Sequence, residues 1–325
     1  MINQKDNSQT SIIERVTDYE PPRNFRSWLI GRPLSTADAS HQTIGKIVGL
    51  AVFASDALSS TAYATQEILG VIAAAGTMAY GYLFPISLAI ITLLAIVTIS
   101  YEQTIHAYPG GGGAYIVARD NLGEMPAQTA GAALLTDYIL TVSVSISAGV
   151  AQIVSAYPAL FPYRVVIAVI AVFFIMLINL RGVKESGTAF AVPTYFFVVM
   201  MVGTVGFGVF RYFTGSLGMV IDPPHFEAKH VLSAITPFIL LHAFANGTTA
   251  LTGVEAISNG ITAFKEPRSK NAGITLIWMS LILGTLFLAL SFLTGKVQAV
   301  FSEEETVISQ LARTIYDGRG ALYLM

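Results

Sequence analysis

Long apolar stretches separated by short polar ones dominate the pattern of this sequence. A helix rises about 1.5 Å per residue, so roughly 17–25 apolar residues cross the ~30 Å hydrocarbon layer of a bilayer. Seven stretches of about this length or more follow one another, at residues 44–75, 79–101, 127–155, 163–180, 189–211, 231–264 and 271–295. The pattern predicts an all-α integral membrane domain over residues 44–325, with a cytosolic N-terminal tail at 1–43 and an extracellular loop at 296–320.

The first and sixth stretches differ from the others because each is longer than one span and carries polar residues near its middle. The interruption runs from Ala54 to Tyr63 in the first and from Gly247 to Gly253 in the sixth. Serine and threonine hydroxyls compete there for backbone groups, and glycine weakens a helix. Broken helices at corresponding positions of two halves are typical of transporters with a substrate site near the middle of the membrane.

The two interrupted stretches are five helices apart, so the second enters the membrane from the side opposite to the first. This arrangement predicts a five-plus-five inverted repeat, and therefore a complete transporter of at least ten helices. The sequence stops at Met325, where an eighth apolar segment is only beginning with Ala321. We expect the chain to be a fragment of the functional unit, truncated after about seven transmembrane helices.

Composition supports a multi-pass membrane protein. The sequence is 54% hydrophobic and only 12% charged, about half the charge content of an average soluble domain. Its net charge of -2 gives no argument for nucleic acid, and without cysteine it forms no disulfide or thiolate metal site.

No apolar core with a basic flank and a cleavage site precedes the first stretch, so a cleaved signal peptide is not expected. A cytosolic N-terminus would place twelve lysine and arginine residues on the cytosolic side of the membrane and six on the outer side. This bias favours that orientation in the cytoplasmic membrane.

Acidic residues within the predicted spans are few. An ionised side chain at the centre of a helix costs about 2.5–3.5 kcal/mol even on the most lenient insertion scale. Asp56 lies in the first interruption, Asp137 in the third span and Glu255 directly after the second interruption. Glu67 is closer to the outer mouth, where we expect it to be solvated. The alternative for the three deep acids is a structural role, as a helix cap or in an interhelical hydrogen bond.

The third span carries a stripe of oxygen atoms on one face. Asp137, Thr141 and Ser145 recur every four residues, with Tyr138 beside them. Each hydroxyl alone could simply bond to the preceding turn or join two helices. Together with Tyr63, Thr252 and the carbonyl groups freed at the two interruptions, the set suits a hard cation. An unpaired Asp56 would repel the carboxylate of an amino acid.

The glycine run from Tyr108 to Tyr115 resembles a phosphate cradle only superficially, because it lacks the Gly-Lys-Ser/Thr ending. We interpret it as a turn or gate between the second and third spans. No group of residues has the spacing of a metal enzyme, and no Ser/His/Asp set can be argued. An enzyme is therefore the least favoured class.

Five segments carry a specific resemblance to a known family. They are Ser55–Tyr63 (SDALSSTAY), Tyr108–Val117 (YPGGGGAYIV), Asp137–Gly149 (DYILTVSVSISAG), Ile178–Gly182 (INLRG) and Leu251–Asn259 (LTGVEAISN). From about Phe25 to its end the chain resembles the KimA-type potassium importers, within the amino acid–polyamine–organocation superfamily.

The resemblance implies a proton-coupled potassium importer with a LeuT-like, five-plus-five inverted-repeat fold. The family's ion-site residues fall on Asp56, Tyr63, Asp137, Tyr138, Thr141, Ser145, Thr252 and Glu255. The family also has an aromatic ligand on a later helix and a cytosolic C-terminal domain that supports dimerisation and, in some members, cyclic di-AMP control. Neither lies within these 325 residues, so any homodimer would form through a domain outside them.

We therefore predict potassium/proton symport, with potassium bound by those eight residues and no cofactor beyond the transported ions. Glu255 is the predicted proton-coupling group, and Asp56 is the second choice. The chain alone is not expected to transport. An amino-acid or polyamine permease is the first alternative, and a nontransporting membrane receptor or scaffold is the second.

Overall fold

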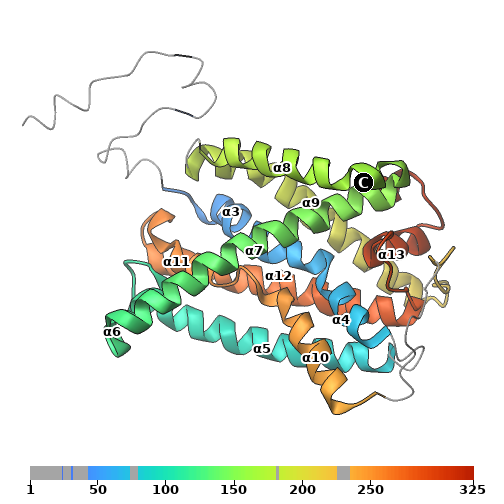
Figure 1. Cartoon of the computed structure of the whole chain (residues 1–325), viewed down its shortest axis with the longest axis horizontal. Coiled ribbons are helices and arrows are strands. Elements are labelled where there is room, and N and C mark those ends of the chain that lie inside the picture. Colours follow the sequence, from blue (N-terminus) through green and yellow to red (C-terminus); the bar gives the residue numbers. More distant parts are fainter. Residues whose placement is uncertain (1–23, 25–30, 32–42, 74–79, 181–182, 225–234) are drawn as a thin grey trace, which may run out of the picture.

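The computed structural model describes residues 24, 31, 43–73, 80–180, 183–224 and 235–325. Nearly all of the predicted N-terminal tail therefore lies outside the described residues. Within the described residues, six helical stretches are long and apolar enough to cross a membrane. They are α3 with α4 (Lys46–Ile72), α5 (Tyr80–Ala107), α7 (Glu124–Ala156), η4 with α8 (Pro158–Asn179), α9 (Val183–Phe213) and α12 (Arg268–Val297). Six of the seven predicted spans are thus confirmed as membrane-length helices (Figure 1).

The remaining predicted span is broken into short pieces. It consists of α10 (Pro237–Gly247), the 3-10 turn η5 (Thr248–Leu251), the single turn α11 (Ala256–Asn259) and the 3-10 turn η6 (Ile261–Ala263). The hydroxyl of Thr236 caps α10 by accepting from the backbone N–H of Ile239, as N-cap threonines do. No one piece is long enough to cross a bilayer, which agrees with the predicted interruption.

The first span is also interrupted, but over fewer residues than predicted. Its two α-helices are α3 (Lys46–Ser59) and α4 (Ala64–Ile72), and the irregular part is confined to η2 (Ser60–Ala62) and Tyr63. Asp56 lies in regular helix near the end of α3. The prediction that it lies within unwound backbone is therefore wrong.

Hydroxyl groups at and beside the two breaks share one pattern of hydrogen bonds. Serine and threonine hydroxyls there donate to the carbonyl three residues earlier: Ser59, the last residue of α3, with Ser60 and Thr61 at the first break, and Thr248, Thr249 and Thr252 at the second. In α5 and α7, Thr98 and Ser155 instead donate to the carbonyl four residues earlier. A tighter turn brings the i−3 carbonyl within reach. The breaks thus share one local chemistry, and hydroxyls occupy carbonyls that we expected to be free.

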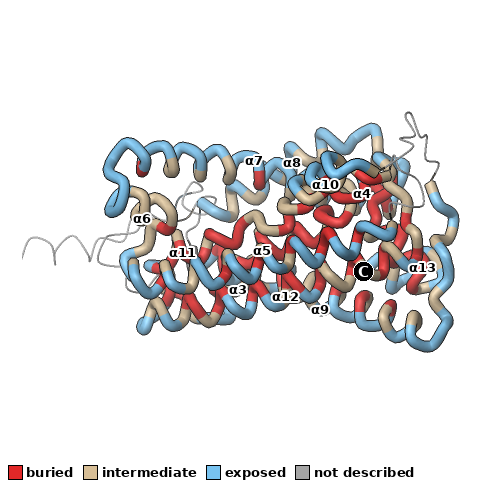
Figure 2. The backbone as a smooth tube through the Cα atoms, turned by 90° about the horizontal axis from the view of Figure 1, so that it is seen from below, coloured by how far each residue is buried: buried red, intermediate tan, exposed pale blue. Residues whose placement is uncertain are grey.

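Helix α12 forms the centre of the bundle. Towards one end, its Phe287 and Leu293 pack in a buried cluster with Ile68 and Ile90. Towards the other, its Leu276 packs with residues of α3 and the sixth span. Figure 2 shows buried backbone along α3, α5 and α12, whereas α7 and α8 are largely exposed. The exposed side of α8 is apolar, as in a helix that faces lipid.

The two ends of the bundle carry different short elements. Figure 1 places α6 (Gly113–Leu122) and α11 at one end, with α13 (Val307–Ile315) near the other. The predicted loop at 296–320 therefore contains a helix. This helix is short and amphipathic. Its polar side chains are buried and form hydrogen bonds within the protein.

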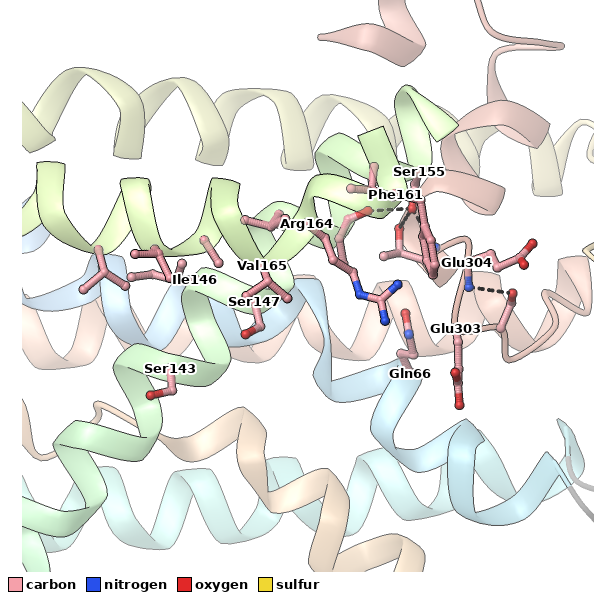
Figure 3. Close-up of a pocket in the computed structure, with 18 residues that line it drawn as sticks. Gln66, Ser143, Ile146, Ser147, Ser155, Phe161, Arg164, Val165, Glu303 and Glu304 are labelled. Atoms are coloured by element: carbon pink, nitrogen blue, oxygen red, sulfur yellow. Dashed lines mark hydrogen bonds between the residues drawn. The ribbon is translucent and has the colours of Figure 1, made fainter. Parts of the chain in front are cut away.

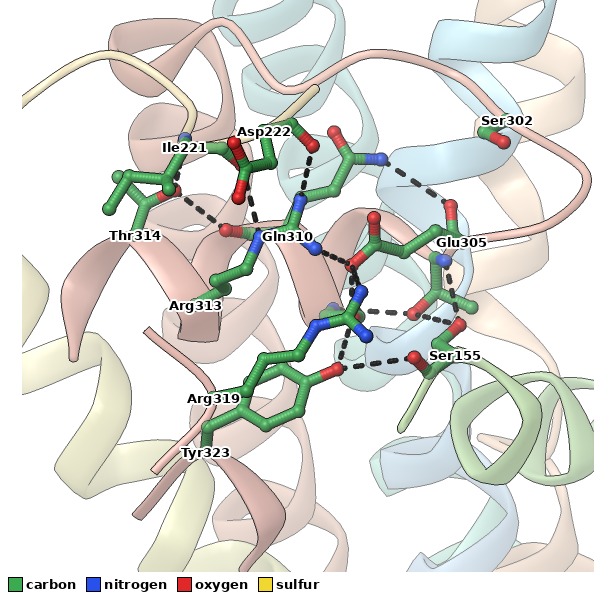
Figure 4. A network of polar contacts seen from close by, with 12 residues as sticks. Ser155, Ile221, Asp222, Ser302, Glu305, Gln310, Arg313, Thr314, Arg319 and Tyr323 are labelled. Carbon is green, nitrogen blue, oxygen red and sulfur yellow. Dashed lines mark hydrogen bonds and ion pairs between the residues drawn. The ribbon is translucent and has the colours of Figure 1, made fainter. Parts of the chain in front are cut away.

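Those contacts form a polar network around α13 (Figure 4). Arg313 pairs with Glu305 at 2.6 Å and also donates to the carbonyl of Asp222. Thr306 donates to Gln152 of α7 through its hydroxyl, at 2.7 Å. The backbone N–H of Val307 donates to the side chain of Gln66 in α4, at 3.1 Å. The network joins the first and third spans to a helix far along the chain.

Candidate functional site

The two broken segments meet each other directly. The hydroxyl of Ser60 donates to the carbonyl of Ala250 at 3.0 Å, and so joins the first break to the second. Gly253 has a φ of +80° and lies against Asp56, so that a Cβ added to it would be 2.6 Å from Asp56 Oδ2. Glycine is needed here both for the backbone angle and for the close approach.

The oxygen stripe of α7 faces the first break. The Ser145 hydroxyl lies 3.2 Å from that of Ser59, while Thr141 is buried, with 6% of its surface exposed. Tyr63 interacts with Ser145 and places its hydroxyl 3.5 Å from Thr252 Oγ1. Hydroxyls from three separated parts of the sequence therefore lie close together.

The three predicted acids also lie near one another. Asp56 interacts electrostatically with Asp137, and Glu255 interacts with both. Glu255 is 8% exposed, and its Oε1 atom has no hydrogen-bond partner in the part of the chain that the structure describes. Neighbouring carboxylates in a poorly solvated place need a bound cation or protons. This arrangement can therefore hold either.

The described residues contain no group of three or more His, Cys, Asp or Glu side chains close enough to hold one metal ion. The three acids are consequently not a compact site of the kind that binds zinc or another small divalent ion. An alkali cation, held by hydroxyl and carbonyl oxygens with carboxylates nearby, fits the mixed set better.

A cavity of about 360 Å³ reaches the site from the end of the bundle that carries α13. Tyr63 and Glu67 line it, together with Gln152 and Thr306. A second cavity of about 400 Å³ shares Gln66 with the first, and Figure 3 shows Gln66 and Glu303 among the side chains that line it. Glu67, which we expected to be solvated, thus lines an open vestibule at the predicted outer mouth.

Sequence reasoning missed three polar residues that join this group. Ser59 bonds to Ser145, and Asn259 donates to the hydroxyl of Tyr138 through Nδ2. Tyr101 of α5 interacts with Glu255. Asn259 could have been found from its spacing, four residues after Glu255. Tyr101 could not have been found in this way, because it is a single tyrosine in the apolar second span.

All eight predicted site residues lie in described parts of the chain. The contacts above join Tyr63 to Thr252, Ser145 to the first break and Tyr138 to the sixth span. Electrostatic interactions relate the three acids. Thr141 lies on the same face of α7 as Ser145. The role of these residues as ligands remains a prediction.

Comparison with known proteins gives two findings. A family model described as "Amino acid permease" matches residues 34–317. The potassium transporter KimA of Bacillus subtilis (strain 168) is 45% identical over 302 residues, which are 92% of this chain and 49% of that protein. The chain thus spans about half the length of the curated relative that it matches.

Proposed function

The chain belongs to the amino acid permease family, and on that premise we propose that the protein containing it imports potassium together with protons. The chain has the LeuT-like transporter fold of that family, with broken first and sixth spans. The observation that carries the proposal is that both broken spans contact α7, in a region where Asp56, Asp137 and Glu255 interact electrostatically. The relative described as a potassium transporter supports potassium as the substrate.

Potassium would enter through the vestibule lined by Tyr63 and Glu67. The hydroxyls of Tyr63, Thr141, Ser145 and Thr252 would replace part of its hydration shell, and the nearby carboxylates would balance its charge. Hard cations prefer such oxygen ligands. The end of the bundle with α13 would then be the extracellular one and the N-terminus cytosolic, in the cytoplasmic membrane.

Glu255 is the proposed proton-coupling group, with Asp56 as the second choice. An unpartnered carboxylate oxygen at the junction can take up a proton without breaking a hydrogen bond to the protein. A membrane potential of 100 mV supplies about 2.3 kcal/mol for each charge moved. A proton carried with each potassium ion adds to this driving force and makes uptake possible against a steeper gradient.

A polyamine or amino-acid permease is the competing proposal, since the matching family model bears the description of an amino acid permease. A polyamine would also be attracted by the three acids. The position of Asp56 beside Gly253 argues against a free amino acid, because its charge would face the substrate carboxylate.

Uptake measurements test the proposal. The protein, with any sequence that follows Met325 in its gene, would be expressed in a strain that lacks potassium import. Glu255→Gln and Asp137→Asn should each lower uptake by about tenfold or more, as loss of a charged ligand contact does. The exposed Glu124, at the start of α7, provides the control Glu124→Gln. Undiminished uptake by both site variants would refute the site, and competition by putrescine would favour the polyamine permease.

A further inference from the structure

The larger of the two cavities described above, of about 400 Å³, lies between α7 and α8. Its apolar walls are formed by Val150 and Val154 of α7 and by Val165, Val169 and Val172 of α8. The short turn η4 joins the two helices, so they run in opposite directions, and each set of valines shares one helix face. From Arg164 to Val172 the wall rises along eight residues, about 12 Å of helix. The cavity is therefore a narrow apolar slot between two membrane-length helices.

Exposed tyrosines place the mouth of this slot at the membrane surface. Tyr157 and Tyr163 flank the turn between the helices, and 55% and 60% of their surfaces are exposed. Tyrosine is enriched where a membrane protein passes from hydrocarbon to headgroups. The mouth of the slot thus lies at headgroup depth, and its valines lie at the depth of the acyl chains of one leaflet.

Charged side chains of both signs line the same cavity. Arg164 begins α8, and its guanidinium carbon lies 4.1 Å from the centroid of the Phe161 ring. Glu303 and Glu304 line the cavity from the segment before α13 (Figure 3). The ion pairs found among the described residues include none between Arg164 and either acid. The opposite charges therefore share one space without neutralising each other directly.

One class of molecule complements all three features. A phosphate group fits arginine, which pairs with phosphate through several N–H donors. An ammonium group is attracted by the two carboxylates, and an acyl chain gains free energy by filling an apolar slot. A lipid that is only anionic would bring its negative charge beside the two acids. The chemistry therefore selects a phospholipid with an amine in its headgroup.

We propose that this cavity binds a phospholipid with an ethanolamine headgroup. Its phosphate lies at Arg164, its ammonium group at Glu303 and Glu304, and one acyl chain between α7 and α8. Ser143 and Ser147 line both this cavity and the vestibule, so the bound lipid forms part of the vestibule wall. The inference does not depend on which ion the protein carries.

Lipid binding to the purified protein, with any sequence that follows Met325 in its gene, tests the site. Dioleoyl phosphatidylethanolamine or dioleoyl phosphatidylglycerol would be added in detergent, and bound lipid would be measured by native mass spectrometry. The wild type should bind the ethanolamine lipid about tenfold more tightly. Arg164→Gln should weaken that binding by about tenfold, as loss of a hydrogen bond to a charged group does. Glu303→Gln combined with Glu304→Gln should abolish the preference between the two lipids.

The slot and the fold are tested by two further variants. Ala168→Leu adds volume within the slot and should weaken the binding of both lipids. Arg119→Gln removes an exposed positive charge from α6, at the other end of the bundle, and should bind both lipids as the wild type does. Melting in detergent without added lipid should match the wild type, which separates lost binding from lost folding.

Three results would each overturn the inference. They are wild-type protein that retains neither lipid, wild-type protein that binds the two lipids equally, and Arg164→Gln protein that binds like Arg119→Gln. If Arg164→Gln fails to fold, the paired glutamate variant and Ala168→Leu decide the question, because unchanged lipid preference in the first and unchanged binding in the second contradict the site.

Discussion

Gly253 is a residue of the second break whose backbone lies against Asp56. Its positive φ and the 2.6 Å distance from an added Cβ to Asp56 Oδ2 both require glycine. The position has no side chain of its own, yet it determines how near an acid on α3 can lie to the sixth span. A single backbone conformation thus controls the spacing of the proposed site.

We expect Gly253→Ala to lower both thermal stability and uptake. The left-handed backbone alone would cost about 1–3 kcal/mol with a side chain present, and the clash would push Asp56 away from its place. Melting in detergent and potassium uptake would measure the two effects.

The control is Gly149→Ala on α7, where an added Cβ meets nothing within 4 Å. Alanine is the better helix former, by roughly 0.5–1 kcal/mol, so this variant should be as stable as wild type or slightly more so. Normal melting and transport in Gly253→Ala would show that the breaks do not depend on this contact.

At the scale of elements, the tetraglycine turn (Gly110–Gly113) packs against α11. Ser258 is fully buried beneath the turn, and its hydroxyl donates to the carbonyl of Glu255. The turn therefore covers the residues directly next to the proposed proton-coupling acid. Opening of the turn would therefore control access to these residues from the end of the bundle that carries α6.

We expect Gly113→Ala to hold this contact open, because its Cβ would overlap Asn259. The chain has no cysteine, so a cysteine introduced by Ser258→Cys can be labelled selectively with a maleimide. In the Ser258→Cys background, Gly113→Ala should speed labelling by about tenfold or more, since reactivity follows the population of the open form.

Gly110→Ala is the matched control, because a Cβ at Gly110 meets nothing within 4 Å and the residue has no positive φ. It should leave the labelling rate unchanged. Equal labelling in both variants would mean that the turn does not shield α11.

At the scale of the whole molecule, the network around α13 joins parts of the chain that are far apart in sequence (Figure 4). Arg313 is 4% exposed and Glu305 is 10% exposed at their side chains. Ser155 of α7 accepts from the backbone N–H of Thr306, and Gln66 of α4 accepts from that of Val307. The network therefore fixes the α4 end of the first break relative to α7, beside the vestibule.

Glu305→Ala should destabilise the protein strongly, because it leaves the Arg313 charge buried without its acid. Breaking a buried pair in this way costs about 3–5 kcal/mol. The pair of Arg119 and Asp120 is about half exposed, so the control Asp120→Ala should cost less than about 1 kcal/mol. Similar losses in melting temperature for the two variants would contradict this account of the network.

The sequence by itself determined the spans, the two interruptions and the stripe on α7. These depend on local patterns: hydrocarbon forces backbone groups to pair within a helix, and the helical repeat sets which side chains share a face. The extent of the first break was wrong because hydroxyls around Asp56 bond to nearby carbonyls without unwinding α3. The helix within residues 296–320 was missed because its polar side chains are satisfied by distant residues.

Only the tertiary structure decided what meets the eight predicted residues. Ser59 and Asn259 join them through contacts with α7, and Tyr101 through its position on α5. The contact between the glycine turn and Asn259 likewise joins two segments that are more than a hundred residues apart in the sequence. Such contacts follow from how helices pack in three dimensions, which no periodicity along a single segment can specify.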